Sequence, residues 1–171
     1  MLGFDDEGKV RGQADAERTP VADFDADIRA LLDHLGAHDD VAALGAAGHC
    51  TGGHLAFRAA MQTDVRATAC WYATGLHDGK LGADPDAGSL ARAAEIGGEL
   101  LMIFGTRDPH TPEDGRATIR RGLDESGVDF TWSLYDAEHA FGRDVGARYD
   151  PAATDAAFAG TVELFRRALA T

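Results

Sequence analysis

The chain has 171 residues, of which 44% are apolar and 26% charged, as expected for one globular domain with a buried core. Its net charge of −13 argues against binding to nucleic acid or to anionic membrane surfaces. No apolar run approaches the ~20 residues that a membrane-spanning helix needs, and the acidic N-terminus is unlike a signal peptide. We therefore expect a cytoplasmic protein in which both cysteines are free thiols.

The hydrophobic pattern predicts helices that alternate with strands. Residues 1–18 show little apolar periodicity and are predicted to be a loose N-terminal segment, so that the domain spans residues 19–171. Thr19-Pro20 is a typical helix start, and Gly36 ends the first apolar periodicity. The predicted strands are 41–47, 67–72, 100–104 and 128–135; the predicted helices lie at 19–36, after Gly53, at 89–96, at 111–127 and at the C-terminus, where Phe158, Val162, Phe165 and Leu169 share one face.

This order of elements implies an α/β fold with a parallel sheet. The first predicted strand, 41–47, is apolar throughout, which is typical of a strand buried on both faces of such a sheet. Ligands of open parallel sheets bind beyond the carboxyl ends of the strands. Functional side chains are therefore expected directly after the predicted strands.

A glycine-rich turn, Gly48-His49-Cys50-Thr51-Gly52-Gly53, follows the first predicted strand. Its glycines leave room for a sharp strand-to-helix turn that holds Cys50 at the sheet edge, as in a nucleophile elbow with cysteine in place of serine. The turn aims the backbone N–H of Thr51 at charge developing on a substrate oxygen, and the helix N-terminus favours the Cys50 thiolate. A small buried cysteine in a glycine-rich turn is the structural alternative.

An acid and a histidine follow two later strands. Asp108 lies just after the predicted strand 100–104, and His139 lies just after the predicted strand 128–135. Each residue alone is a weak signal, because turn aspartates and surface histidines are common. Together with Cys50 they give the chain order nucleophile, acid, histidine, which is the order of α/β-hydrolases. The sequence therefore predicts a catalytic triad of Cys50, Asp108 and His139.

The segments that carry these residues resemble the dienelactone hydrolase family of the α/β-hydrolase superfamily. GHCTGGHLAF is similar to the cysteine elbow of that family, FGTRDPHTP to the segment with its acid, and YDAEHAFGRD to the segment with its histidine. The resemblance implies a three-layer α/β-hydrolase fold and carboxymethylenebutenolidase-like hydrolysis of a small lactone or ester, through a cysteine thioester and with neither metal nor cofactor. It also implies that Arg143 binds the substrate carboxylate; a solvated surface arginine is the structural alternative.

The resemblance runs from about Pro20 to the C-terminus and corresponds to roughly the last two-thirds of such an enzyme, with about four strands. We find no counterpart of the family's loop that supplies a second oxyanion N–H, or of its glutamate that helps control the cysteine. No motif supports Arg11 or Arg18 as a second substrate-binding arginine. We therefore expect an impaired catalyst whose first strand has an unpaired edge, which favours self-association.

Two alternatives remain beside the hydrolase. One is a fragment or subunit that needs elements from elsewhere to be active. The other is a different cysteine-elbow enzyme, such as an amidotransferase, which the long separation of Asp108 and His139 disfavours. His49 and His54 flank the elbow as candidate pocket residues. Trp71 and Tyr72 end the second predicted strand near the expected pocket mouth, where core packing is favoured over substrate contact, and Cys70 is predicted to be buried in that strand. The remaining histidines, His34, His38, His77 and His110, are predicted to be solvated, without metal-ligand spacing.

Overall fold

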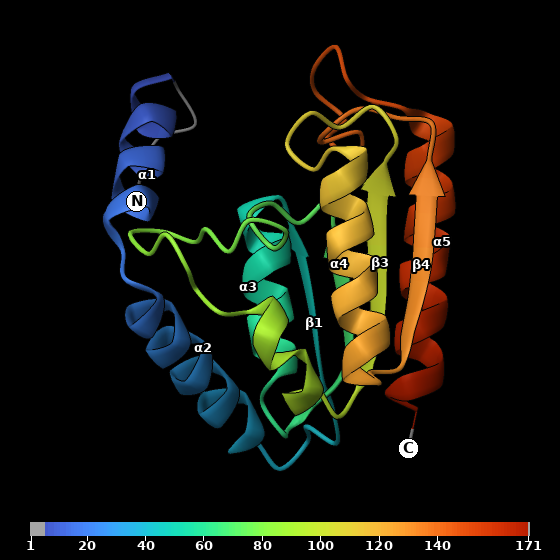
Figure 1. The fold of residues 1–171 in the computed structure, drawn as a ribbon. Helices are drawn as coiled ribbons and strands as arrows, with labels where there is room; N and C mark the ends of the chain where they lie inside the picture. The colour runs from blue at the N-terminus through green and yellow to red at the C-terminus, as the bar shows by residue number, and fades with distance from the viewer. Residues whose placement is uncertain (1–5, 171) are drawn as a thin grey trace.

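The computed structural model describes residues 6–170, and its centre is a parallel four-stranded sheet (Figure 1). The strands are β1 (Leu44–His49), β2 (Val65–Trp71), β3 (Glu99–Gly105) and β4 (Phe130–Tyr135), and they lie side by side in that order. Each predicted strand is present, although β1 lies closer to the elbow than predicted. The predicted α/β class with about four strands is confirmed.

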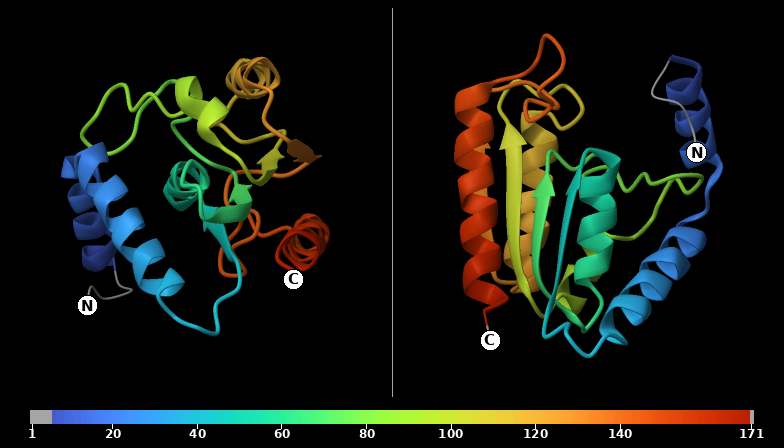
Figure 2. Two further views of the ribbon diagram at one scale, coloured as in Figure 1. Left: turned by 90° about the horizontal axis from the view of Figure 1, so that it is seen from below. Right: turned by 180° about the vertical axis from the view of Figure 1, so that it is seen from behind.

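Helices cover both faces of the sheet, so the molecule has three layers (Figure 2). On one face lie α3 (Thr51–Ala60), the 3-10 helix η1 (Leu90–Glu95) and α4 (Glu113–Ser126), with α2 (Val21–Gly36) packed beside α3; α5 (Pro151–Ala168) covers the other face. The apolar run of β3 serves both cores, because Met102 packs on the α3 side and Leu101 and Ile103 on the α5 side.

The strand before the elbow is covered on one face only, so the prediction that it is buried on both faces is wrong. Leu44 is buried, whereas Gly45, Ala47 and His49 on the opposite face are exposed. The reason is that α5 packs mainly over β2 and β3. Within the described residues β1 pairs with β2 alone, so its other edge presents unpaired backbone groups.

A helix, α1 (Asp6–Arg18), occupies most of the segment that was predicted to be loose; residues 1–5 of that segment lie outside the described residues. Its side chains form pairs three or four residues apart, such as Gln13 with Glu17 and Arg11 with Asp15. Such pairs stabilise a helix without an apolar stripe, which explains why hydrophobic periodicity did not reveal it.

The long helices begin and pack differently from the sequence prediction. Pro20 is the residue before α2, and the first N–H of that helix, at Val21, donates to the distant Asp84 carboxylate at 2.7 Å. On α5 three of the four buried side chains are small (Ala153, Ala157 and Thr161, beside Leu164), whereas Phe158 of the predicted apolar face is 62% exposed. Small residues let α5 approach the sheet closely, which periodicity of large apolar residues does not predict.

Candidate active site

Cys50 lies in the turn between β1 and α3, in a backbone conformation that few residues adopt. Its φ of 58° and ψ of −123° are strained for a residue with a side chain. The Cys50 N–H donates to the Trp71 carbonyl at 3.0 Å, and the Gly53 N–H donates to the Cys50 carbonyl at 2.9 Å. Gly48 must be glycine, because a Cβ there would lie 1.9 Å from the Gly52 carbonyl oxygen. This local structure is a sharp strand-to-helix turn of the kind that a nucleophile elbow requires.

Asp108 and His139 lie beside Cys50 at the same edge of the sheet. His139 Nδ1 is 2.7 Å from Asp108 Oδ2, and His139 Nε2 is 3.2 Å from the Cys50 sulfur. The second oxygen of Asp108 accepts a hydrogen bond from the His110 N–H at 2.8 Å, which fixes the carboxylate. Asp108 is 2% exposed and His139 is 5% exposed. The structure thus brings together the three side chains that the sequence singled out.

The contacts among these side chains favour charge separation between Cys50 and His139. The hydrogen bond with His139 lowers the pKa of Cys50, against the opposing effect of burial. Burial alone would lower the pKa of His139, but hydrogen bonds with Asp108 and Cys50 raise it to about 9. Burial opposes ionisation of Asp108, yet its hydrogen bond with His139 keeps the pKa of that carboxyl below its usual range. The shifts of Cys50 and His139 both favour a thiolate beside an imidazolium over the two neutral side chains.

The backbone N–H of Thr51, the first residue of α3, also hydrogen-bonds the Cys50 sulfur and contributes to the lowered pKa of Cys50. The N-terminus of α3 adds a partial positive charge at the same point. The Thr51 N–H and the end of α3 thus both favour negative charge at Cys50.

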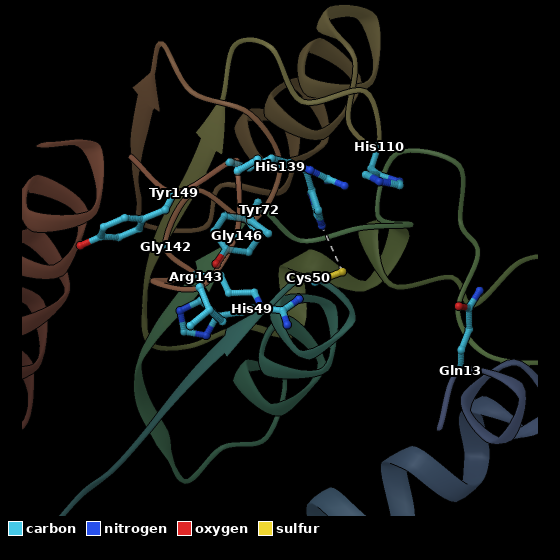
Figure 3. Close-up of a pocket in the computed structure, with 14 residues that line it drawn as sticks. Gln13, His49, Cys50, Tyr72, His110, His139, Gly142, Arg143, Gly146 and Tyr149 are labelled. Atoms are coloured by element: carbon cyan, nitrogen blue, oxygen red, sulfur yellow. Dashed lines mark hydrogen bonds between the residues drawn. The ribbon is translucent and has the colours of Figure 1, made fainter. Parts of the chain in front are cut away.

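An open pocket of about 970 Å³ lies over Cys50 and His139 (Figure 3). Arg143, for which the family resemblance implies a carboxylate-binding role, lines it, and Figure 3 shows its side chain beside Cys50 and His49. Arg148 lines the same pocket. Both arginines are exposed, and neither side chain bonds to another residue within the described range. The pocket thus carries positive charge in an otherwise acidic protein.

Two further residues line the pocket beside His139. His110 is exposed, as predicted, and its ring centroid lies 4.5 Å from that of His139. Tyr72 is buried, as predicted for a core residue at the end of the second strand, and it also lines the pocket, with its ring centroid 5.2 Å from that of His139.

Backbone strain is concentrated at this pocket. Among the described residues other than glycine, positive φ angles occur at Cys50 (58°), Tyr72 (37°) and Ala140 (60°), and all three line the pocket. Such conformations cost free energy and persist only where the surrounding structure enforces them, which is common at functional sites.

The remaining candidates lie elsewhere. His54, a candidate for the pocket, is fully buried in the core. Arg11 and Arg18 both pair with Asp15 on the exposed surface of α1 and do not line the pocket, although Gln13 of that helix does. Between residues 6 and 170, no helix is long and apolar enough to cross a membrane, and no three His, Cys, Asp or Glu side chains cluster as metal ligands would.

Known proteins resemble this chain over most of its length. A protein of Saccharomyces cerevisiae named as a carboxymethylenebutenolidase is 35% identical over 176 residues, which cover 98% of this chain and 64% of the relative. The chain therefore spans just under two-thirds of that relative's length.

Solved structures share the fold. A structure from Klebsiella pneumoniae described as a dienelactone hydrolase has a TM-score of 0.76 at 23% identity, over 86% of this chain and 62% of the other. The acylaminoacyl peptidase of Pyrococcus horikoshii has a TM-score of 0.71 at 18% identity, over 91% of this chain and 29% of the other. The sequence pattern of the dienelactone hydrolase family matches residues 5–169, and this chain therefore belongs to the dienelactone hydrolase family.

Proposed function

We propose that the protein hydrolyses a small carboxylic ester or lactone through a thioester on Cys50. The observation that carries this proposal is the continuous contact from Asp108 through His139 to the Cys50 sulfur, with distances of 2.7 and 3.2 Å. The family and the name of the yeast relative support the same chemistry.

The first half of the proposed reaction forms the thioester. The Cys50 thiolate attacks the substrate carbonyl, so that a carbon–sulfur bond forms and negative charge moves to the carbonyl oxygen, within reach of the Thr51 N–H. The carbonyl group then re-forms from the negatively charged oxygen as the carbon–oxygen bond of the ester breaks. The leaving oxygen takes the proton from the His139 imidazolium. In a lactone the leaving oxygen stays tethered to the acyl group.

The second half releases the acid. Neutral His139 takes a proton from water while the water oxygen attacks the thioester carbon. The carbon–sulfur bond then breaks, which gives the carboxylic acid and restores the thiolate beside the imidazolium. Asp108 accepts from Nδ1 of His139, so the neutral ring carries its proton there and Nε2 is free to take a proton on the side of Cys50. The same carboxylate stabilises the imidazolium form.

We also propose that the substrate carries a carboxylate. Arg143 and Arg148 bring two guanidinium groups to the pocket, and neither is neutralised by another described side chain. A guanidinium is well matched to a carboxylate, with which it forms paired hydrogen bonds. We expect Arg143→Gln to raise KM for an ester that carries a carboxylate and to leave KM for a neutral ester unchanged.

Replacement of each cysteine tests the proposed nucleophile. With p-nitrophenyl acetate, we expect Cys50→Ala to lower kcat/KM by at least about 10³-fold, because the covalent step is lost. Cys70→Ala is the matched control, since Cys70 is fully buried in β2 and burial raises the pKa of its thiol. Acid quenching during turnover should trap an acetyl group on Cys50. Full activity of Cys50→Ala would contradict the proposal.

The unpaired edge of β1 favours a second candidate, in which the chain is a subunit completed by strand pairing along this edge, either with another copy or with a different chain. We propose such self-association, which sedimentation measurements would contradict if the protein stayed monomeric at high concentration.

We also propose that the protein works in the cytoplasm, because both thiols are free and the cytosol keeps thiols reduced.

A further inference from the structure

A buried chain of hydrogen bonds approaches Cys50 separately from Asp108 and His139. It begins at Asp25 on α2, whose carboxylate accepts two hydrogen bonds from Arg58 at 2.7 and 2.6 Å. Arg58 donates to the Ser89 hydroxyl at 2.7 Å, and that hydroxyl lies 2.7 Å from Nε2 of His54. Nδ1 of His54 is 2.9 Å from the Thr74 carbonyl oxygen. Arg58, Ser89 and His54 are each at most 2% exposed.

The donors and acceptors in this chain have one consistent direction. The Thr74 carbonyl can only accept, so Nδ1 of His54 carries the proton and Nε2 is an acceptor. Ser89 must then donate its hydroxyl proton to Nε2, while its oxygen accepts from Arg58. Burial, together with the nearby charge of Arg58, lowers the pKa of His54 to about 4, so His54 stays neutral at physiological pH. A neutral histidine with both nitrogens bonded acts as a rigid connector.

The connector ends on Thr74, which contacts Cys50 twice. The Thr74 N–H donates to the Cys50 carbonyl at 3.3 Å, and the Thr74 hydroxyl oxygen lies 4.0 Å from the Cys50 sulfur. Within residues 6–170 that hydroxyl has no other hydrogen-bond partner. A thiolate can only accept, so beside a charged Cys50 the hydroxyl must be the donor.

We propose that Thr74 is a further catalytic residue, whose hydroxyl donates a hydrogen bond to the Cys50 thiolate, and that His54 is the positioning residue that holds it there. The proposal rests on the proposed role of Cys50 as nucleophile. Thr74 belongs to the loop after β2, so it approaches the sulfur independently of the Thr51 N–H and of His139. The hydroxyl contact also lowers the pKa of Cys50, as a donor to the thiolate should.

The test is the pH dependence of Cys50 alkylation by iodoacetamide, followed by peptide mass spectrometry so that Cys50 and Cys70 are read separately. We expect Thr74→Val, which keeps the shape and removes the hydroxyl, to raise the midpoint by about 0.5–1 pH unit. Below the midpoint this shift corresponds to about 3–10-fold slower alkylation and hydrolysis, while the rates at high pH change little. Thr74→Ser, which restores a hydroxyl, should return the midpoint toward that of the wild type.

Matched variants distinguish the effect of the Thr74 hydroxyl on Cys50 from a general destabilisation of the protein. Thr118→Val removes an exposed hydroxyl on α4, which bonds only within its own helix, and should leave the midpoint unchanged. His54→Leu should shift the midpoint in the same direction as Thr74→Val, whereas His54→Asn, which keeps a donor near the Thr74 carbonyl, should shift it less. An unshifted midpoint in folded Thr74→Val overturns the inference.

Alkylation also distinguishes this inference from the proposed function, because it needs no hydrolysis. If Cys50→Ala abolishes activity and Thr74→Val shifts nothing, only the role of Thr74 fails. If Cys50→Ala is fully active, the proposed function fails, whatever the alkylation profile shows.

Discussion

Two buried histidines near Cys50 differ in charge because their partners differ. His139, 5% exposed, lies between the Asp108 carboxylate and the Cys50 sulfur, and these contacts raise its pKa to about 9. His54, fully buried one helical turn after Cys50, lies between a carbonyl and a hydroxyl close to Arg58, and its pKa falls to about 4. Burial lowers the pKa of both rings, and only at His139 do the contacts with Asp108 and Cys50 outweigh this effect.

Cys50 thus lies between a histidine in contact with a carboxylate, from the loop after β4, and a histidine with neutral partners, from α3. His139 faces the open pocket, where a charged imidazolium can give its proton to a leaving group. His54 is enclosed among α2, α3 and the loops that follow β2, where a neutral ring with both nitrogens bonded fixes the local geometry. Substitutions around His139 and substitutions around His54 should therefore have different effects.

The largest expected effect comes from removing the negative charge beside His139. Asp108→Asn keeps the shape of the side chain but can donate from its amide, which favours the wrong tautomer of His139. We expect kcat/KM for p-nitrophenyl acetate to fall by about 10³–10⁴-fold and the alkylation midpoint of Cys50 to rise.

Asp136→Asn is the control for that substitution. Asp136 lies close by but on the surface, where it pairs with Arg107. Its loss should change kcat/KM less than twofold, because exposed ion pairs contribute little. Similar rates for Asp108→Asn and Asp136→Asn would mean that His139 does not depend on its carboxylate partner.

The next largest effect concerns the turn that holds Cys50 between the two histidines. In Gly48→Ala the added Cβ would lie 1.9 Å from the Gly52 carbonyl oxygen, so the backbone must move. We expect a loss of about 3 kcal/mol or more in the free energy of unfolding, measured by urea denaturation. Gly52→Ala is the control from the same motif, since nothing lies within 4 Å of its added Cβ. It should be neutral or stabilising by up to ~1 kcal/mol, and equal losses in the two variants would rule out the clash as the cause.

Much of the site could be predicted from the sequence because its residues follow strands. Cys50, Asp108 and His139 each come directly after a strand, and a parallel sheet brings the ends of its strands to one edge. Arg143 lines the pocket, whereas the carboxylate-binding role that the family resemblance implies for it stays a prediction. The hydrogen bond from the His110 backbone to Asp108 was not predicted, because such a contact gives no signal in the sequence.

What could not be predicted depends on contacts between distant segments. The Thr74 contact with His54 joins the loop after β2 to α3, and Ser89 reaches the same ring from a third segment. The exposed face of β1 depends on where α5 packs, which the apolar composition of the strand does not reveal. Helix α1 is stabilised by side-chain pairs four residues apart and not by an apolar stripe, so hydrophobic periodicity did not predict it.

The smallest predicted effect isolates His54 through the pH dependence of stability. A histidine whose pKa is lowered in the folded protein, from its ordinary value near 6.5 to about 4, resists protonation that the unfolded chain accepts. Its contribution to stability is therefore complete above the unfolded pKa and is lost as the pH falls from about 6.5 toward 4. We expect the free energy of unfolding of the wild type to fall by about 2 kcal/mol more than that of His54→Asn between pH 7 and pH 5. Asp108 and the other carboxylates titrate in both proteins and cancel in the difference, which urea denaturation at the two pH values measures. Parallel losses in the two proteins would mean that His54 gains a proton in the folded state as readily as in the unfolded chain, and the contrast with His139 would then disappear.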